Sequence, residues 1–308
     1  MSAGYLAVDG GGSSTEFLLE DCAGRRLASF VVGSTSKKSI GFEGAQANVL
    51  AGIRLLRGHL DEMGLRLEDV FGVWGLSGCD SEADRREYEG MLVAAGLDLS
   101  RHKVINDSLL ALRLCTQGPG IVVIAGTGSV AVGVGEDGSM RRIGGWGYQA
   151  SDLGSGCWAG TQLLREALLH DDGCRADDPA FDRVREQLGC VRGQMGPAAA
   201  LLDGANQIAA FARIAMESQD SPVCESIRQQ GASYLAGYVA SVAESLFGGE
   251  GAPEFQVVFA GGLFKNDGFA ARVMQLVQER GIPEARIHCI TGSPVGGGIV
   301  LAHMMFDR

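Results

Sequence analysis

The sequence predicts a duplicated α/β protein of two lobes with a cleft between them. The first observation is an internal repeat, because a shift of 116 positions superposes two glycine-rich segments: Gly10 falls on Gly126, Gly12 on Gly128 and Ser13 on Ser129. The second is that apolar strands alternate with segments of helical periodicity in both halves. The third is the length, since 308 residues suffice for about two domains.

Each copy of the repeat is predicted to be a β-meander of three strands. In each, an apolar strand enters a Gly/Ser turn, a second strand follows, and two arginines open a third: the first two strands are Tyr5–Val8 and Glu16–Leu19, then Ile121–Ala125 and Val130–Val134. The same offset places Glu20-Asp21 on Glu136-Asp137 and Arg25-Arg26 on Arg141-Arg142. We interpret these matches as a true duplication.

The segments after each meander are predicted to be mainly helical, with further strands between them. Apolar spacing and end signals predict these helices: Gly41–Gly64, Asp80–Ala95, Gly160–His170, Asn206–Gln219, Pro222–Phe247, Asn266–Arg280 and Val295–Phe306. The further strands are Phe71–Leu76, His102–Ile105, Gln256–Ala260 and Arg286–Ile290. Asp80 or Ser81 would open the second helix, and its acidic start is most simply a dipole effect.

The domain boundary is predicted near Cys115–Pro119, where Thr-Gln-Gly-Pro-Gly interrupts the pattern. We expect an N-terminal lobe over residues 1–117 and a C-terminal lobe over 118–295. The last helix, at about 296–308, is expected to pack back on the first lobe.

Composition excludes several classes of function. A net charge of −11 argues against binding to nucleic acid or to anionic membranes. We expect no signal peptide, because the N-terminus has neither a basic region nor a long apolar run. We expect no membrane span, because no uninterrupted apolar run reaches about 18 residues. The eight cysteines are scattered without a Cys-x-x-Cys motif, which is typical of reduced thiols in a cytoplasmic protein.

The two glycine turns are the strongest sign of chemistry. Asp9-Gly-Gly-Gly-Ser-Ser and Gly126-Thr-Gly-Ser129 each join two strands. Glycine lets successive N–H groups point into one concavity, which suits phosphate oxygens. The alternative is an ordinary tight hairpin. Neither turn is a Walker A loop, since no Gly-Lys-Ser/Thr follows, and neither leads into a helix as a dinucleotide fingerprint does.

Asp9 is the candidate metal ligand, because the second copy has Ala125 in its place. A carboxylate beside a phosphate nest is repelled unless a cation lies between them, which favours Mg²⁺ held through water. The alternative is a solvated turn aspartate that caps neighbouring N–H groups.

Two further glycine clusters lie near the C-terminus. Gly261 and Gly262 end an apolar strand and would let a flat ring or ribose lie against the backbone. Ser293-Pro-Val-Gly-Gly-Gly-Ile299 begins the last helix and is either a hinge, which we favour, or an anion site.

Asp107 is the candidate general base, because phosphoryl transfer to an alcohol requires a proton acceptor. It follows a strand and precedes a helix, so an N-cap is the competing interpretation. Asp152 stands before an apolar helix and is either another cap or a carboxylate that accepts hydrogen bonds from sugar hydroxyls. Trp146 lies in a glycine-rich loop and is either a packing residue or a cleft residue.

These motifs resemble the sugar kinase/Hsp70/actin ATPase superfamily. The resemblance rests on these segments: Asp9-Gly-Gly-Gly-Ser-Ser, Asn106-Asp107, Ala125-Gly-Thr-Gly-Ser129, Ala260-Gly-Gly262 and Pro294-x-x-Gly-Gly-Gly298. Within it, Gly145-Trp-Gly147 and Ser151-Asp-x-Gly-Ser155 are similar to the N-acetylglucosamine kinase and glucosamine kinase group of the BadF/BadG/BcrA/BcrD ATPase family. The resemblance runs along nearly the full length.

The resemblance implies a duplicated RNase H-like fold that closes around Mg²⁺, ATP and an amino sugar. Asp107 would deprotonate the sugar 6-hydroxyl, and Gly261 and Gly262 would bind adenosine. The phosphate-binding residues would be Gly11, Gly12, Ser13, Ser14, Gly126, Thr127, Gly128 and Ser129. The sugar-binding residues would be Ser36, Ser77, Asn106, Asp107, Trp146 and Asp152. The family also suggests a homodimer, formed through the second lobe.

Two departures leave the sugar open. N-acetylglucosamine kinases usually show Gly-Asp-Glu-Gly-Ser where this chain has Ser151-Asp152-Leu153-Gly154-Ser155, which is closer to glucosamine kinases. The family's sugar-binding Asn after the third strand is Ser36 here. The zinc-binding cysteine cluster of the related ROK sugar kinases is absent from the sequence. Two other functions stay open: an ATP-hydrolysing activator of a 2-hydroxyacyl-CoA dehydratase with an iron–sulfur cluster, and a non-catalytic nucleotide or sugar sensor.

Overall fold

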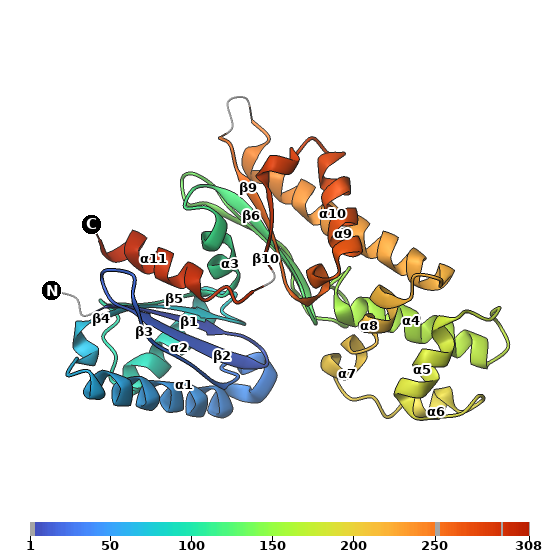
Figure 1. The fold of residues 1–308 in the computed structure, drawn as a ribbon, viewed down its shortest axis with the longest axis horizontal. Coiled ribbons are helices and arrows are strands. Elements are labelled where there is room, and N and C mark those ends of the chain that lie inside the picture. Colours follow the sequence, from blue (N-terminus) through green and yellow to red (C-terminus); the bar gives the residue numbers. More distant parts are fainter. Residues whose placement is uncertain (1–3, 250–252, 291, 308) are drawn as a thin grey trace. The chain divides into compact units, whose positions relative to one another are not determined.

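The computed structural model describes residues 4–249, 253–290 and 292–307 (Figure 1). The chain divides into two compact units. Unit 1 comprises the described residues up to Gln117 together with those from Gly292 onward, and unit 2 those between Gly118 and Thr291.

Unit 1 contains a mixed five-stranded sheet in the order β3-β2-β1-β4-β5. The strands are β1 (Gly4–Gly10), β2 (Ser14–Glu20), β3 (Arg26–Gly33), β4 (Val70–Leu76) and β5 (His102–Asn106). The first three form the predicted antiparallel meander, and β4 and β5 run parallel to β1. The carboxyl ends of β1, β4 and β5 therefore lie at one edge of this sheet.

Helices cover both faces of this sheet. They are α1 (Lys37–Glu62), α2 (Glu82–Ala94), α3 (Ser108–Cys115) and α11 (Gly296–Phe306), with a 3-10 turn η1 at Leu67–Asp69. One buried cluster joins Phe17 and Trp74 to α1 and α2, and another joins Tyr5 and Ala7 to α3 and α11. In Figure 1, α1 and α11 lie on opposite sides of the unit 1 sheet. The predicted start of α1 at Gly41 is a break inside the helix, where φ is 75°.

Unit 2 repeats the strand order of unit 1. Its strands are β6 (Gly120–Ala125), β7 (Ser129–Val134), β8 (Met140–Gly144), β9 (Gln256–Ala260) and β10 (Ile287–Ile290). The order β8-β7-β6-β9-β10 places the third, second, first, fourth and fifth strands side by side, as in unit 1. Both sheets also share the antiparallel meander and the parallel later strands. The predicted duplicated α/β fold is confirmed.

The constant offset of 116 does not persist beyond the glycine turn. Asp9 pairs with Glu16, which the offset equates with Val132, but Ala125 pairs with Ser129, three residues earlier. Arg26 likewise faces Glu20, whereas Arg142 faces Val132. The Glu-Asp and Arg-Arg matches are therefore not structurally equivalent, because the second turn is shorter than the first. Turns tolerate such length changes, whereas the order of strands in a sheet does not.

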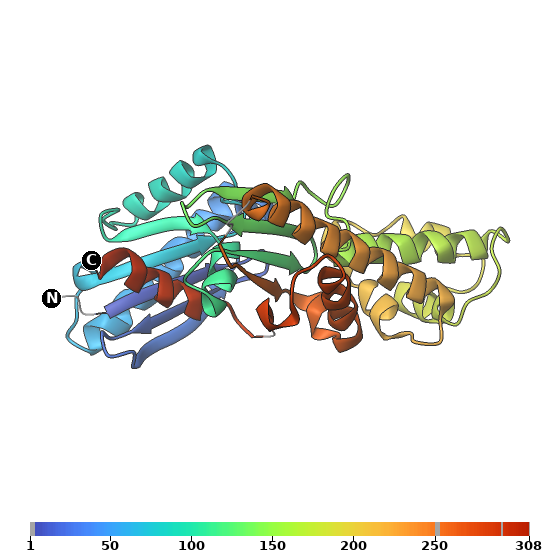
Figure 2. The ribbon, with the colours of Figure 1, turned by 90° about the horizontal axis from the view of Figure 1, so that it is seen from above.

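The remaining helices of unit 2 extend the fold around its sheet. They are α4 (Gly156–Asp171), α5 (Ala180–Leu188), α6 (Met195–Ala199), α7 (Ala205–Ala209), α8 (Ala212–Glu217), α9 (Pro222–Phe247) and α10 (Asp267–Gln278), with 3-10 turns η2 (Gly262–Lys265) and η3 (Glu284–Arg286). Helix α9 runs across β6, β7 and β8 (Figure 2). The single helix predicted over 206–219 is two short helices, because the chain bends between them to bury Phe211.

Candidate functional site

The carboxyl edge of the unit 1 sheet gathers the polar residues that the sequence analysis singled out. Gly10 pairs with Leu76, and Leu76 pairs with Asn106, so the ends of β1, β4 and β5 are level. The ends of these neighbouring strands therefore carry four of the predicted site residues: Asp9, Ser77, Asn106 and Asp107. Ser77 is held there by its N–H, which donates to the Gly10 carbonyl at 2.8 Å.

The first glycine turn presents exposed backbone at the same edge. The Gly11 N–H donates to the Ser14 carbonyl at 3.0 Å and closes the turn. The Gly11 carbonyl accepts from Ser34 Oγ at 2.9 Å, which ties the turn to the chain that follows β3. Gly12, Ser13 and Ser14 are exposed. Their N–H groups and hydroxyls are thus accessible to an anion, as the nest interpretation requires.

Asp9 stands in an electrostatically unfavourable place for a lone carboxylate. Burial, and next the negative charges of Asp107 and Glu16, raise the pKa of Asp9 to about 7. Such a group gains most from a nearby cation. Mg²⁺ is usually bound by one or two carboxylates together with phosphate oxygens and water, so Asp9 fits it. Within the described part of the chain, no group of three or more His, Cys, Asp or Glu side chains is arranged to hold a metal by itself.

Asp107 occupies the N-cap position of α3 without acting as the cap. Its side chain makes no capping hydrogen bond, and its backbone is already helical, with φ −58° and ψ −30°. Asn106 does the capping instead: its Oδ1 accepts from the Ser108 N–H at 3.1 Å and from Ser108 Oγ at 2.5 Å. The structure therefore does not support the N-cap interpretation of Asp107, and a general base requires a carboxylate that capping does not occupy.

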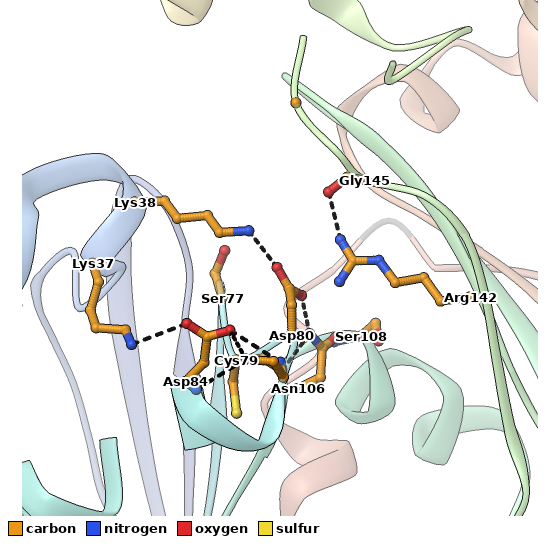
Figure 3. A network of polar contacts seen from close by, with 12 residues as sticks. Lys37, Lys38, Ser77, Cys79, Asp80, Asp84, Asn106, Ser108, Arg142 and Gly145 are labelled. Atoms are coloured by element: carbon orange, nitrogen blue, oxygen red, sulfur yellow. Dashed lines mark hydrogen bonds and ion pairs between the residues drawn. The ribbon is translucent and has the colours of Figure 1, made fainter. Parts of the chain in front are cut away.

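A polar network around Asp80 includes Asn106 and Ser108, the two chain neighbours of Asp107, and sequence reasoning missed its role (Figure 3). Asp80 accepts from Asn106 Nδ2 at 3.0 Å and forms an ion pair with Lys38. Ser81, and not Asp80, caps α2 through a capping box with Asp84. The signal was in the sequence: once Ser81 is recognised as the cap of that box, Asp80 is left outside the helix start.

Ser36 is buried, with 2% of its surface exposed. It precedes α1 and its N–H donates to Ser34 Oγ at 3.1 Å. Ser77 is half-buried, and its carbonyl accepts from the Tyr88 hydroxyl at 2.8 Å. Both therefore lie in loops adjoining the carboxyl edge, although Ser36 has little accessible surface.

The second glycine turn, in unit 2, is held by the N-terminus of α4. The Gly156 N–H donates to the Gly126 carbonyl at 2.7 Å, and the Cys157 N–H donates to the Thr127 carbonyl at 3.0 Å. The first amides of the helix thus bind the turn's carbonyls, which fixes the turn. Thr127 is exposed and its hydroxyl lies 3.2 Å from Asn206 Oδ1. Ser129 differs, because its hydroxyl is buried and donates to the Leu153 carbonyl at 2.8 Å.

Asp152 lies against this turn. An atom added as Cβ on Gly128 would stand 2.6 Å from Asp152 Oδ2, so a larger residue there would have to displace the Asp152 carboxylate. Asp152 is 6% exposed and has a φ of 55°, the left-handed region that side chains rarely adopt. Its Oδ1 accepts from the Gly147 N–H at 3.3 Å. A buried carboxylate in strained backbone, placed between a phosphate-type turn and a glycine loop, is typical of a functional position.

The loop that carries Trp146 is open to solvent. Trp146 is 74% exposed, and the Arg142 guanidinium lies 4.8 Å from the centre of its ring. Arg142 also donates to the Gly145 carbonyl at 2.6 Å (Figure 3). Trp146 is therefore not a core packing residue. Arg142 contacts this loop, and the sequence analysis did not identify it.

A cavity of about 630 Å³ adjoins the second turn within unit 2, in the usual size range of small-molecule sites. It extends from Gly126, Thr127 and Gly156 to α7, α8 and the start of α10, and Gly262 lines it. Gly261, which precedes Gly262, requires glycine: its φ is 105°, and a Cβ added there would stand 2.5 Å from the Ala125 carbonyl oxygen. The expected phosphate turn and the expected adenosine turn therefore meet at one cavity.

Curated proteins similar to this chain are amino-sugar kinases by name. The chain is 31% identical over 179 residues to the N-acetyl-D-glucosamine kinase of Dictyostelium discoideum, covering 54% of this chain and 55% of that protein. It is 31% identical over 169 residues to the N-acetylmuramic acid/N-acetylglucosamine kinase of Clostridium acetobutylicum, covering 54% of each. A glucosamine kinase of Vibrio cholerae is 26% identical over 188 residues, covering 58% and 60%. The chain thus spans about half the length of the curated relatives it matches.

Solved structures share the fold along nearly the whole chain. The "Putative N-acetylglucosamine Kinase" of Chromobacterium violaceum has a TM-score of 0.75 and 24% identity, covering 98% of this chain and 99% of that one. The ROK hexokinase of Thermus thermophilus has a TM-score of 0.55 and 16% identity, covering 98% of each. None of the described helices is long and apolar enough to cross a membrane. The sequence model of one family matches residues 6–297, and the protein therefore belongs to the BadF/BadG/BcrA/BcrD ATPase family.

Proposed function

We propose that this protein is an ATP-dependent kinase that phosphorylates an amino sugar, N-acetylglucosamine or glucosamine, at the 6-hydroxyl. The observation that carries the proposal is the carboxyl edge of unit 1, where Asp107 begins α3 while Asn106 does the capping. Family membership and the names of three curated relatives support the reaction class.

Asp107 acts as the general base in this proposal. It accepts the proton of the sugar hydroxyl as the oxygen bonds to the γ-phosphorus of ATP, and ADP leaves with the electrons of the broken bond. Phosphoryl transfer needs mainly positioning and charge stabilisation, so a rigid base at the end of a parallel strand is suited to it.

The nucleotide is proposed to use the glycine turns and the unit 2 cavity. Gly12, Ser13 and Ser14 offer exposed donors in one unit, and Gly11 closes that turn through its N–H. Gly126, Thr127 and Gly128 offer turn backbone in the other unit. Ser129 would contribute backbone only, since its hydroxyl is engaged by Leu153. Gly262 lines the cavity and Gly261 precedes it in the chain, so the nucleoside is proposed to lie against these two glycines.

Mg²⁺ is proposed to be held by Asp9, whose raised pKa marks a carboxylate that a cation stabilises. The ion neutralises charge on the transferring phosphate when it is bound. Glu16, which pairs with Asp9 across the strand ladder, adds negative charge near the same place.

The sugar is proposed to contact Ser77, Asn106 and Asp107 in unit 1 and Trp146 and Asp152 in unit 2. Ser36 belongs to the same proposal, through a loop that would need to expose it. A cytoplasmic homodimer remains a prediction from the sequence and the family resemblance.

A coupled assay of ADP release tests the function directly. The purified protein is given Mg²⁺ and ATP with glucosamine, N-acetylglucosamine, glucose or N-acetylmannosamine in turn. We expect release with one or both of the first two sugars, and the product to be the 6-phosphate by NMR. Sugar-independent hydrolysis, or no release with any sugar, would contradict the kinase proposal.

A further inference from the structure

Asp80 makes two contacts that link separate loops of unit 1 (Figure 3). One carboxylate oxygen accepts from Asn106 Nδ2 at 3.0 Å, and the other forms the ion pair with Lys38. The Asp80 side chain is only 15% exposed, whereas that of Lys38 is 60% exposed. Because Ser81 caps α2, the side chain of Asp80 is not required to start that helix.

Asn106 is the residue through which Asp80 reaches the base. The Asn106 amide nitrogen donates to Asp80 and also to the Cys79 carbonyl, at 3.2 Å. These two bonds fix which way the amide faces, so its oxygen points to the Ser108 N–H and hydroxyl. If the amide turned, α3 would lose its cap. Asp107 could replace it only by leaving its present helical backbone, with φ −58° and ψ −30°, and that change would move its carboxylate.

Lys38 extends the linkage to the first turn of α1. Its methylene groups lie against the turn at Gly78, where an added Cβ would approach them to 3.4 Å. One carboxylate thereby holds together the start of α1 at Lys38, the turn of Ser77–Asp80 and the segment Asn106–Ser108.

We infer that Asp80 is a positioning residue for the general base: by holding the Asn106 amide, it keeps Asn106 as the cap of α3 and keeps Asp107 out of that role. The inference rests on the proposed function, in which Asp107 receives the proton. Lys38 balances the charge that Asp80 places beside Asn106.

The test compares Asp80→Ala, which removes both contacts, with Asp80→Asn, which keeps an acceptor for Asn106. For Asp80→Ala we expect kcat to fall about 10- to 100-fold, the size of effect that misplacing a reacting group has, while KM for ATP stays within about twofold. Asp80→Asn should recover most of kcat. Should Asp80→Ala not fold, Asp80→Ser, whose hydroxyl is too short to reach Asn106, takes its place with the same expectation.

Glu87→Ala and Glu87→Gln are the matched controls. Glu87 lies on α2 and pairs with Lys37, so these variants remove a similar ion pair without touching Asn106. Both should keep wild-type kcat. Equal losses from Glu87→Ala and Asp80→Ala would reveal general loosening of α2 and would overturn the inference.

Amide hydrogen exchange at Ser108 gives a readout that needs no turnover. Its N–H donates to Asn106 Oδ1, so Asp80→Ala should accelerate its exchange at least tenfold, and Asp80→Asn and the Glu87 variants should not. Wild-type kcat in Asp80→Ala, or unchanged Ser108 exchange, overturns the inference. Absence of sugar-dependent ADP release in the wild type would instead refute the kinase proposal, and Ser108 exchange would still decide whether Asp80 sets the start of α3.

Discussion

Neighbouring residues with similar side chains take different roles at the carboxyl edge of unit 1. Asn106 and Asp107 are nearly isosteric, yet the amide caps α3 and the carboxylate does not. An amide both donates and accepts, so Asn106 can bind Asp80 and Ser108 at once. An ionised carboxylate only accepts, which suits Asp107 for receiving a proton.

Replacing Asp107 by Asn should abolish sugar phosphorylation while nucleotide binding persists. General-base catalysis contributes about 10²- to 10⁴-fold, so kcat should fall at least 100-fold. The Kd for ADP should stay within about threefold, because the proposal assigns Asp107 to the sugar hydroxyl and not to the nucleotide. Calorimetric titration with ADP and the coupled assay measure the two effects, and undiminished turnover would remove Asp107 from the mechanism.

Asp9 should make the stability of the ligand-free protein fall as pH rises. Its pKa is about 7 in the folded protein against 3.8 for the free side chain, so the folded state resists ionisation. The resulting decrease in the free energy of unfolding is absent below pH 4 and grows as pH rises to about 7. Above that pH it is complete, at no more than about 4 kcal/mol. Asp9→Asn should therefore be more stable than the wild type at pH 8 and equal to it at pH 4, and should lack kinase activity.

Denaturant titrations at these two pH values measure the effect on the free energy of unfolding. Asp61→Asn, which changes an exposed aspartate of α1, is the control for a general change of charge. If Asp9→Asn shows no greater gain at pH 8 than Asp61→Asn, Asp9 is not strained by ionisation and its assignment to Mg²⁺ loses its support.

Candidate functional residues could be predicted from the sequence where a motif defined the local backbone around them. Asp9, Asp107 and Gly261 stand at ends of strands that periodicity alone predicts. Side-chain direction was not predictable: Ser129 repeats the Ser of the first turn, but its hydroxyl is buried against Leu153. The capping box indicates only that Asp80 lies outside α2, and its contacts were missed because its partners Lys38 and Asn106 are distant in sequence.

At the scale of elements, close packing of α11 explains a glycine cluster that the sequence analysis interpreted as a hinge. Helix α11 packs on β1 and α3. A Cβ on Gly297 would stand 1.9 Å from the Leu110 carbonyl oxygen, which is backbone and cannot rotate away. The glycines thus let the last helix approach α3, beneath the strand that carries Asp9.

Gly297→Ala should destabilise unit 1 strongly and Gly296→Ala should not. The first change forces α11 away from α3 and overpacks the interface, a class of change that typically costs about 1–3 kcal/mol. On Gly296 a Cβ meets only the end of the Leu114 side chain, at 3.3 Å, and alanine favours the helix. Urea unfolding of both variants measures the difference, and equal stabilities would contradict the packing argument.

Elements with strong periodicity could be predicted from the sequence, and short ones could not. The predicted bounds of α9 and β9 agree with the structure, because long apolar spacing and Pro222 define one and a continuous apolar run defines the other. Helices α5 and α6 were not predicted, and α7 and α8 were predicted as one. Short helices depend on tertiary contacts, such as burial of Phe211, that the local sequence does not reveal.

At the scale of the whole molecule, the same strand order is used twice with different insertions. Between the first and second parallel strands, unit 1 inserts α1 and unit 2 inserts α4 to α9. The buried apolar clusters of the described chain follow the units: one consists of unit 2 residues and two of unit 1 residues. Each unit therefore has a core of its own, and stability need not be lost in a single step.

Nucleotide should stabilise the two cores unequally. In the proposed function the nucleoside cavity belongs to unit 2, so ADP without Mg²⁺ or sugar should stabilise that unit by mass action, about 2.7 kcal/mol at a hundredfold excess over Kd. Trp158 reports on unit 2 and the fully buried Trp74 on unit 1. In a Trp74→Phe, Trp146→Phe variant the unfolding midpoint of Trp158 fluorescence should rise with ADP. In a Trp146→Phe, Trp158→Phe variant the midpoint of Trp74 should rise less. Equal shifts would show that the units unfold as one, and no shift in either would contradict nucleotide binding in the cavity.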